Sequence, residues 1–126
     1  MSSELIEYSK NWRYKTNKKN SARYVLGKYG DDPLICIGVN PSTASPEKLD
    51  NTNRSVQRLS INNGFDSWIT INLYAQRATN PEDIHKRLNR DLHESNLLEI
   101  RNLMETIPKP NIWTAWGGLI ESRPFF

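Results

Sequence analysis

Short apolar segments alternate with amphipathic segments along the chain, and this alternation is typical of an α/β fold. The segments 33–39 (PLICIGV) and 111–116 (NIWTAW) are apolar runs of the kind found in strands that are covered on both faces. Altogether, the pattern predicts β-strands over residues 22–29, 33–39, 67–75 and 111–116.

Helical periodicity fills the intervals between the later strands. A helix is predicted over residues 52–63, with Val56 and Leu59 on one side. The segment NPED, 80–83, has the features of a helix start, because an asparagine cap and a proline precede two acidic residues. A further helix is expected over residues 91–106, where two prolines follow shortly after.

The order of these elements predicts a three-layer α/β fold with a short, mostly parallel sheet. Helical crossovers of this length make the last three strands parallel. The strand at 22–29 leads into the next through a short GDDP turn, so it is expected to add as an antiparallel edge strand. The length of 126 residues fits one domain, predicted over residues 22–126, with residues 1–21 as a basic N-terminal arm.

Small polar residues follow each of the three parallel strands. They lie in the segments 40–44 (NPSTA), 72–79 (NLYAQRAT) and 116–118 (WGG). Ligands of open α/β sheets bind beyond the carboxyl ends of the strands, so these segments predict a pocket at one rim. The substrate-binding candidates are Pro41, Ser42, Thr43, Asn72, Arg77, Thr79, Trp116 and Gly117.

Two residues at this rim are catalytic candidates. Pro41 biases Asn40 toward an extended backbone, and the Asn40 amide can hold a water or a base edge. The alternative is an Asx or Ser/Thr turn that only closes the strand. Asp50 is either a base reaching the pocket or the cap of the following helix. Arg77 suits a phosphate or carboxylate, or else it pairs with Asp50 or caps carbonyl groups.

The positive charge is concentrated near the N-terminus. Residues 1–28 hold seven basic and two acidic side chains, whereas the whole chain has a net charge of +3. This asymmetry favours an acidic partner, with nucleic acid or a nucleotide as the first candidate. The alternative is a solvated arm without a partner. The nucleic-acid-binding candidates are Lys15, Lys18, Lys19 and Arg23.

Several classes of function lack their sequence signals. No segment has the roughly 20 apolar residues of a membrane span, and no signal peptide is recognisable, so no membrane association and a cytoplasmic location are expected. Cys36 is expected to be a buried thiol. His85 and His93 have no partners at metal-ligand spacing, and the CxxC, HExxH, P-loop and GxSxG motifs are absent. Neither a metal nor a cofactor is therefore predicted.

The succession NPSTAS, Asp50-x-Thr52, NLYAQRATNP and AWGG resembles a family of domains of unknown function, number 1643 in that series, found in bacteria and their viruses. The resemblance extends from about residue 22 to residue 118. It implies little about activity, because the family has no established one. Members of the family continue to a final segment with a His-Pro-Leu-Tyr-like motif, so this chain, which stops at SRPFF, is expected to be truncated at its C-terminus.

A second resemblance concerns the segment GVNPS, 38–42, which is similar to the strand-tip motif of mismatch-type uracil-DNA glycosylases. It implies a glycosylase-like α/β/α fold, with an asparagine that positions the attacking water. The matching residues are Gly38, Asn40 and Pro41. The second motif of those enzymes, His-Pro-Ser, which supports the flipped base, is absent.

These observations lead to two main hypotheses. The first is a domain that acts on or binds DNA or nucleotides, with N-glycosidic base excision as the reaction. The alternative is a non-catalytic binding or inhibitor module of phage origin on the same scaffold; a third is an enzyme acting on a small N-glycoside. The apolar end 113–126 further predicts self-association or a protein partner, unless Phe125 and Phe126 fold back onto the sheet.

Overall fold

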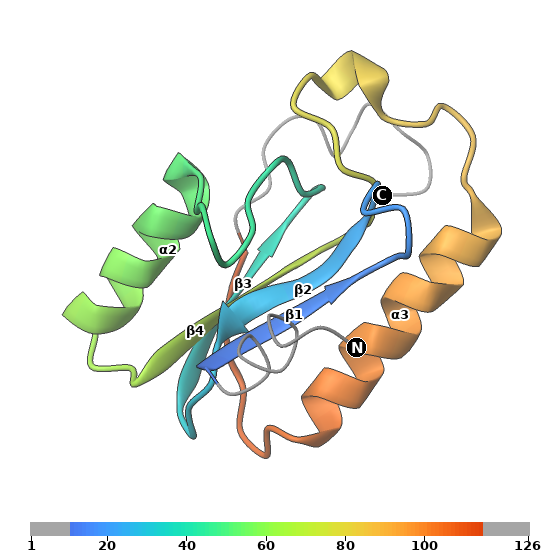
Figure 1. The fold of residues 1–126 in the computed structure, drawn as a ribbon. Coiled ribbons are helices and arrows are strands. Elements are labelled where there is room, and N and C mark those ends of the chain that lie inside the picture. The colour runs from blue at the N-terminus through green and yellow to red at the C-terminus, as the bar shows by residue number, and fades with distance from the viewer. Residues whose placement is uncertain (1–10, 115–126) are drawn as a thin grey trace.

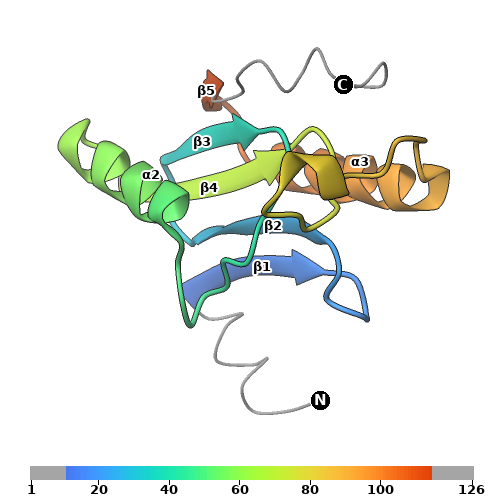
Figure 2. The ribbon, with the colours of Figure 1, turned by 90° about the horizontal axis from the view of Figure 1, so that it is seen from above.

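The computed structural model describes residues 11–114 (Figure 1). A five-stranded mixed sheet has the strand order β1-β2-β4-β3-β5, and Figure 2 shows the strands side by side in this order. Its strands are β1 (Trp12–Thr16), β2 (Arg23–Lys28), β3 (Pro33–Gly38), β4 (Ser67–Asn72) and β5 (Asn111–Thr114). The helices are α2 (Asn51–Asn62), the short 3-10 helix η1 (Pro81–Asp83) and α3 (Arg90–Glu105).

The predicted α/β class and the parallel direction of the last three strands are confirmed. Strand β3 lies between β4 and β5 and is parallel to both. Strand β2 is antiparallel, as predicted, but it is not the edge strand that was expected, because it lies between β4 and β1. Glycine at position 27 permits the pairing of β2 with β4, because a Cβ there would lie 2.3 Å from the carbonyl oxygen of Trp68.

The two long helices cover opposite faces of the sheet (Figure 1). Alternation along the strands sorts the core into two clusters. Ile35 and Ile69 belong to the cluster against which Leu103 of α3 packs. Cys36 and Trp68, each adjacent in sequence to one of these isoleucines, share the other cluster with Val56 of α2. Within residues 11–114, no helix is long and apolar enough to cross a membrane.

Three elements differ from the sequence prediction. Residues 12–16, expected within a basic arm, form the edge strand β1, which pairs antiparallel with β2. Trp12 explains part of this, because its ring packs edge-on against Trp68 at 6.1 Å and so ties the strand to the core. The NPED segment forms only the three-residue helix η1. Strand β4 ends at residue 72 rather than 75.

The parallel pairing of β3 with β4 creates the rim on which the site is built. The last residues of the two strands, Gly38 and Asn72, are register partners. Strand β5 runs the same way and pairs with β3 up to Thr114. Trp116 and Gly117, which follow β5, lie outside the described residues, as do residues 1–10 and the end of the chain from residue 115.

Candidate functional site

Two loops, residues 39–44 and 73–79, leave the rim side by side and are joined by backbone hydrogen bonds. The amide of Tyr74 donates to the carbonyl of Val39, and the amide of Ala78 donates to that of Pro41, both at 2.9 Å. Among the side chains, the hydroxyls of Ser42 and Thr79 lie 2.7 Å apart. The convergence of the first two predicted segments is therefore present in the fold.

Asn40 holds the two loops together. Its Nδ2 donates to the carbonyl oxygens of Pro41 at 3.0 Å and Ala78 at 2.9 Å, with a longer bond of 3.4 Å to that of Gln76. This role is structural, but it is not the Asx turn expected as the alternative to catalysis, because the side chain donates to carbonyl oxygens of both loops. The amide oxygen Oδ1 has no hydrogen bond to any other described residue, so it remains available to a water or a ligand.

Arg77 stabilises the first loop through its carbonyl groups. One terminal nitrogen, Nη1, donates to the carbonyl oxygens of Ser42 at 2.7 Å and Ala44 at 3.0 Å. The other, Nη2, donates to the hydroxyl of Tyr14 at 2.8 Å and to Oδ1 of Asn20 at 3.1 Å. These four bonds use both terminal nitrogens of the guanidinium, so Arg77 acts as a clamp and does not present a free fork to an anion.

Arg23 lies where the sequence analysis did not expect it. It was grouped with three exposed lysines as a phosphate contact, but its side chain is only 2% exposed. The reason is its position in β2, where Ala22 and Tyr24 on either side are also buried. Its bonds are long: Nη1 donates to the carbonyl of Ala44 at 3.3 Å and Nη2 to Oγ1 of Thr70 at 3.4 Å.

The electrostatic state of Arg23 reflects this poor solvation. Burial, followed by the neighbouring positive charge of Arg77, lowers the pKa of Arg23 to about 10, while the carboxylate of Asp50 acts in the opposite direction. The side chain therefore remains charged at neutral pH. A buried cation whose hydrogen bonds are long and directed at neutral acceptors is unusual, because buried charges are normally paired.

Arg23 lines a cavity of about 280 Å³ beneath the loop 39–44, which we call the strand-tip cavity. Within the described part of the chain, Nε of Arg23 and Nδ2 of Asn72 are both buried and lack a hydrogen-bond partner. Asn72 is 6% exposed and lines the same cavity. The other lining residues include Cys36, Asn40, Ser42, Asp50, Thr52, Asn53 and Thr70.

Asp50 joins this cavity to α2. It is the N-cap of the helix, and its Oδ1 accepts from the backbone amide of Asn53 at 2.9 Å and from Nδ2 of the same residue at 2.8 Å. Oδ1 of Asn53 in turn accepts from the hydroxyl of Thr70 at 2.9 Å. The alternative that Asp50 caps the helix is therefore confirmed, and the cap uses only Oδ1. The other oxygen, Oδ2, has no hydrogen bond within residues 11–114.

The three remaining basic candidates lie at the surface. Lys15 belongs to β1, and Lys18 and Lys19 lie in the turn that follows it. This turn adjoins the rim, because the amide of Arg77 donates to the carbonyl of Ser21 at 2.8 Å. Two of the predicted nucleic-acid contacts are therefore next to the predicted pocket, a proximity that the sequence analysis did not anticipate. Thr43 is also exposed, and Pro41 is buried.

Sequence reasoning missed Arg23, Asn53 and Thr70 as members of the site. A signal for Arg23 did exist, namely an arginine directly before the apolar residues Tyr24, Val25 and Leu26 of the predicted strand. No comparable signal marks Asn53 or Thr70, because one looks like a helix residue and the other like an ordinary strand residue. Among residues 11–114, no group of three or more His, Cys, Asp or Glu side chains is placed to hold a metal ion.

The fold and the rim together define an α/β domain with a polar cavity at the carboxyl ends of its parallel strands. The chain belongs to DUF1643, a family of proteins of unknown function, which matches residues 23–124. This match confirms the family predicted from the motifs. No curated protein and no solved structure is significantly similar to the chain. The resemblance to glycosylases therefore still rests on Gly38, Asn40 and Pro41.

Proposed function

We propose that the strand-tip cavity binds a nucleotide, free or as a unit of a DNA strand, through the unpaired donors of Arg23 and Asn72. The single observation that carries this proposal is the presence of two buried, unsatisfied donors on residues that line one cavity. Leaving a buried donor unpaired costs about 1–3 kcal/mol, and more if the group is charged. A ligand with acceptor oxygens removes that penalty on binding.

The size and the surroundings of the cavity favour a nucleotide over a small free anion. A volume of about 280 Å³ lies just below the range for small-molecule sites, so it suits one base or one phosphate group of a larger ligand. Both types of group offer acceptor oxygens. The exposed Lys18 and Lys19 beside the rim supply positive charge for neighbouring phosphates.

The reaction that this arrangement favours is hydrolysis of an N-glycosidic bond. Asp50 would act as the base toward a water through Oδ2, and Oδ1 of Asn40 would orient that water. Both residues line the cavity, and these two oxygens have no partner among residues 11–114. Arg23 would hold an oxygen of the departing base. The binding module without catalysis is the second candidate, favoured by the use of Asn40 Nδ2 as a structural clamp.

Fluorescence anisotropy with labelled single-stranded and duplex oligonucleotides tests the binding step. We expect Arg23→Met to remove most of the affinity. The matched control is Arg101→Met, the same change at an exposed arginine outside the cavity, which should leave affinity unchanged. The double variant Lys18→Glu, Lys19→Glu should weaken the salt dependence. For single strands, the slope of log affinity against log salt concentration should become shallower by about 1.4, or about 0.7 for each phosphate that is no longer bound. Equal losses in the Arg23 and Arg101 variants would contradict the proposal.

Base release from uracil-containing DNA, detected as alkali-labile strand cleavage, separates the two candidates. If the domain is catalytic, Asp50→Asn should abolish release while oligonucleotide binding persists. If the wild-type chain binds DNA without releasing any base, the binding module is the correct function. An Arg77→Lys variant is unsuitable for this comparison, because Arg77 holds the loop itself in place.

A further inference from the structure

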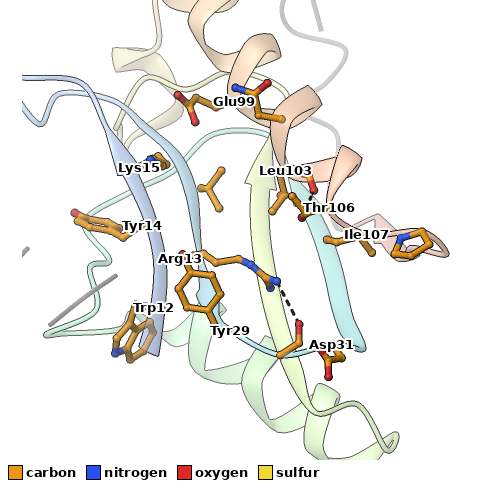
Figure 3. A pocket seen from close by; sticks show the side chains of 14 residues that line it. Trp12, Arg13, Tyr14, Lys15, Tyr29, Asp31, Glu99, Leu103, Thr106 and Ile107 are labelled. Carbon is orange, nitrogen blue, oxygen red and sulfur yellow. Dashed lines mark hydrogen bonds between the residues drawn. The ribbon is translucent and has the colours of Figure 1, made fainter. Parts of the chain in front are cut away.

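A second and larger cavity lies on the opposite face of the sheet, between β1 and the C-terminal half of α3 (Figure 3). Its volume is about 670 Å³, well within the range of small-molecule sites. It shares no lining residue with the strand-tip cavity. It forms because α3 packs on β2 and leaves a space in front of the edge strand. We call it the β1–α3 groove.

The walls of this groove differ in chemistry. Arg13 and Lys15 are two residues apart on β1, so both belong to the face that looks toward α3, whereas Trp12 and Tyr14 belong to the other (Figure 3). The floor is apolar and includes Val25 and Ile107, which are 3% and 6% exposed. The wall formed by the helix is polar, with the side chains of Glu99, Asn102 and Thr106.

Arg13 is held in place before any ligand arrives. Its Nη1 donates to the carbonyl of Lys28 at 3.1 Å and its Nη2 to that of Gly30 at 3.2 Å. The guanidinium also lies 5.0 Å from the centre of the Tyr29 ring. Burial is the main cause that lowers the pKa of Arg13, so the cation is partly desolvated. A preorganised and partly desolvated cation attracts an anion more strongly than a mobile surface lysine does.

We propose that the β1–α3 groove binds a small organic anion that has a flat apolar body. The apolar body would lie on the floor beside the half-exposed ring of Tyr29, and the anionic group would face Arg13 and Lys15 on β1. Glu99 and Asp31 also line the groove, and their carboxylates repel an anion from the positions next to them. This site is separate from the strand-tip cavity and does not depend on the function proposed for it.

The anilinonaphthalenesulfonate dye ANS is a suitable probe, because it combines a flat apolar body with a single sulfonate and fluoresces in apolar surroundings. We expect saturable one-to-one binding to the folded full chain. Thr106→Phe fills the groove from the helix and should weaken binding at least about tenfold. Glu105→Phe is the matched control, since that neighbour is also exposed on α3 but does not line the groove, and it should bind as the wild type does.

A pair of charge reversals tests the role of the cations. Lys15→Glu should weaken ANS binding by about tenfold, because it turns an attraction into a repulsion, whereas Lys86→Glu makes the same charge change at an exposed lysine outside both cavities and should have little effect. Equal behaviour of the members of either pair would overturn the proposal. It would also be overturned if light scattering revealed a dimer that Thr106→Phe dissociates, since the groove would then be an interface between chains.

Discussion

Replacing Arg23 by methionine should make the protein more stable while removing its ligand. Methionine has a similar length and fills the same buried channel without a charge. The substitution leaves no new unsatisfied group. The carbonyl of Ala44 keeps its bond from Arg77 at 3.0 Å, and the hydroxyl of Thr70 keeps its bond to Asn53 at 2.9 Å. A buried residue that costs stability is what a functional rather than a structural role predicts.

The size of the effect follows from the pKa of Arg23. Lowering it from the ordinary value to about 10 corresponds to about 3 kcal/mol against the charged form in the folded state. The two hydrogen bonds that are removed contribute at most about 0.5–1.5 kcal/mol each, and their lengths of 3.3 and 3.4 Å place them at the low end. The net expectation is a gain of about 1–2 kcal/mol in the free energy of unfolding.

Guanidinium unfolding followed by circular dichroism measures this difference directly. Because the folded-state pKa is lowered, the unfavourable contribution of Arg23 is complete below about pH 10 and is relieved only above it. The gain in the methionine variant should therefore be the same at pH 6 and at pH 9. Arg77→Met is the comparison, because it breaks four bonds of 2.7–3.1 Å and should lose about 2–4 kcal/mol.

A loss of more than about 1 kcal/mol in Arg23→Met would refute this reasoning. It would mean that Arg23 is a structural clamp like Arg77, and that its unpaired Nε does not indicate a ligand. The proposed nucleotide site would then lose its main support, even if the variant also failed to bind DNA, because an unstable variant loses binding for trivial reasons.

Further measurements follow from other residues. Asn40→Asp should lower the free energy of unfolding by about 2–3 kcal/mol in a urea titration, because a carboxylate would face the carbonyl oxygens that Nδ2 now bonds. Cys36 should react with a thiol reagent only on unfolding, since burial raises its pKa to about 11 and keeps it protonated. Hydrogen bonds, first from Ser67 and then from the amide of Asp32, lower the pKa of Asp66. Its stabilising contribution should therefore be lost as the pH falls through that lowered value, and Asp66→Asn should flatten the acid limb of the stability profile.

The sequence predicted the parallel strands correctly because their signals are local. A run such as PLICIGV has no polar face, and such a run fits a strand that is covered on both sides. The edge strand β1 was missed because its lysine and arginine suggested a solvated arm. Its alternation of Trp12 and Tyr14 with Arg13 and Lys15 is the period of a strand whose two faces meet different surroundings. The prediction of an arm used the charge of this segment and overlooked its alternation.

Which strands become neighbours was beyond the reach of these local signals. The short turn after β2 suggests a partner in β3, yet β2 pairs with β4. Pairing depends on close approach of two backbones, and the relevant evidence is one glycine, Gly27, whose missing side chain makes room for Trp68. The same limit applies to the short η1, because an N-cap and a proline define where a helix can begin but say nothing of how far it continues.

The two arginines at the rim illustrate why site residues cannot be assigned by type alone. Arg77 was predicted either to bind an anion or to take a structural role such as capping carbonyl groups, and the structure shows the carbonyl capping. Arg23 was predicted to contact nucleic acid. The structure satisfies the terminal nitrogens of Arg77 with four short bonds and leaves those of Arg23 with two long ones. The two cations are close enough that the charge of Arg77 lowers the pKa of Arg23. The fold thus places two like charges together but forms short bonds only to the terminal nitrogens of Arg77. Arg23 is left with unused hydrogen-bonding capacity. Arg23 lines the cavity, so recognition of an acceptor there needs no rearrangement of the loop that Asn40 and Arg77 already hold.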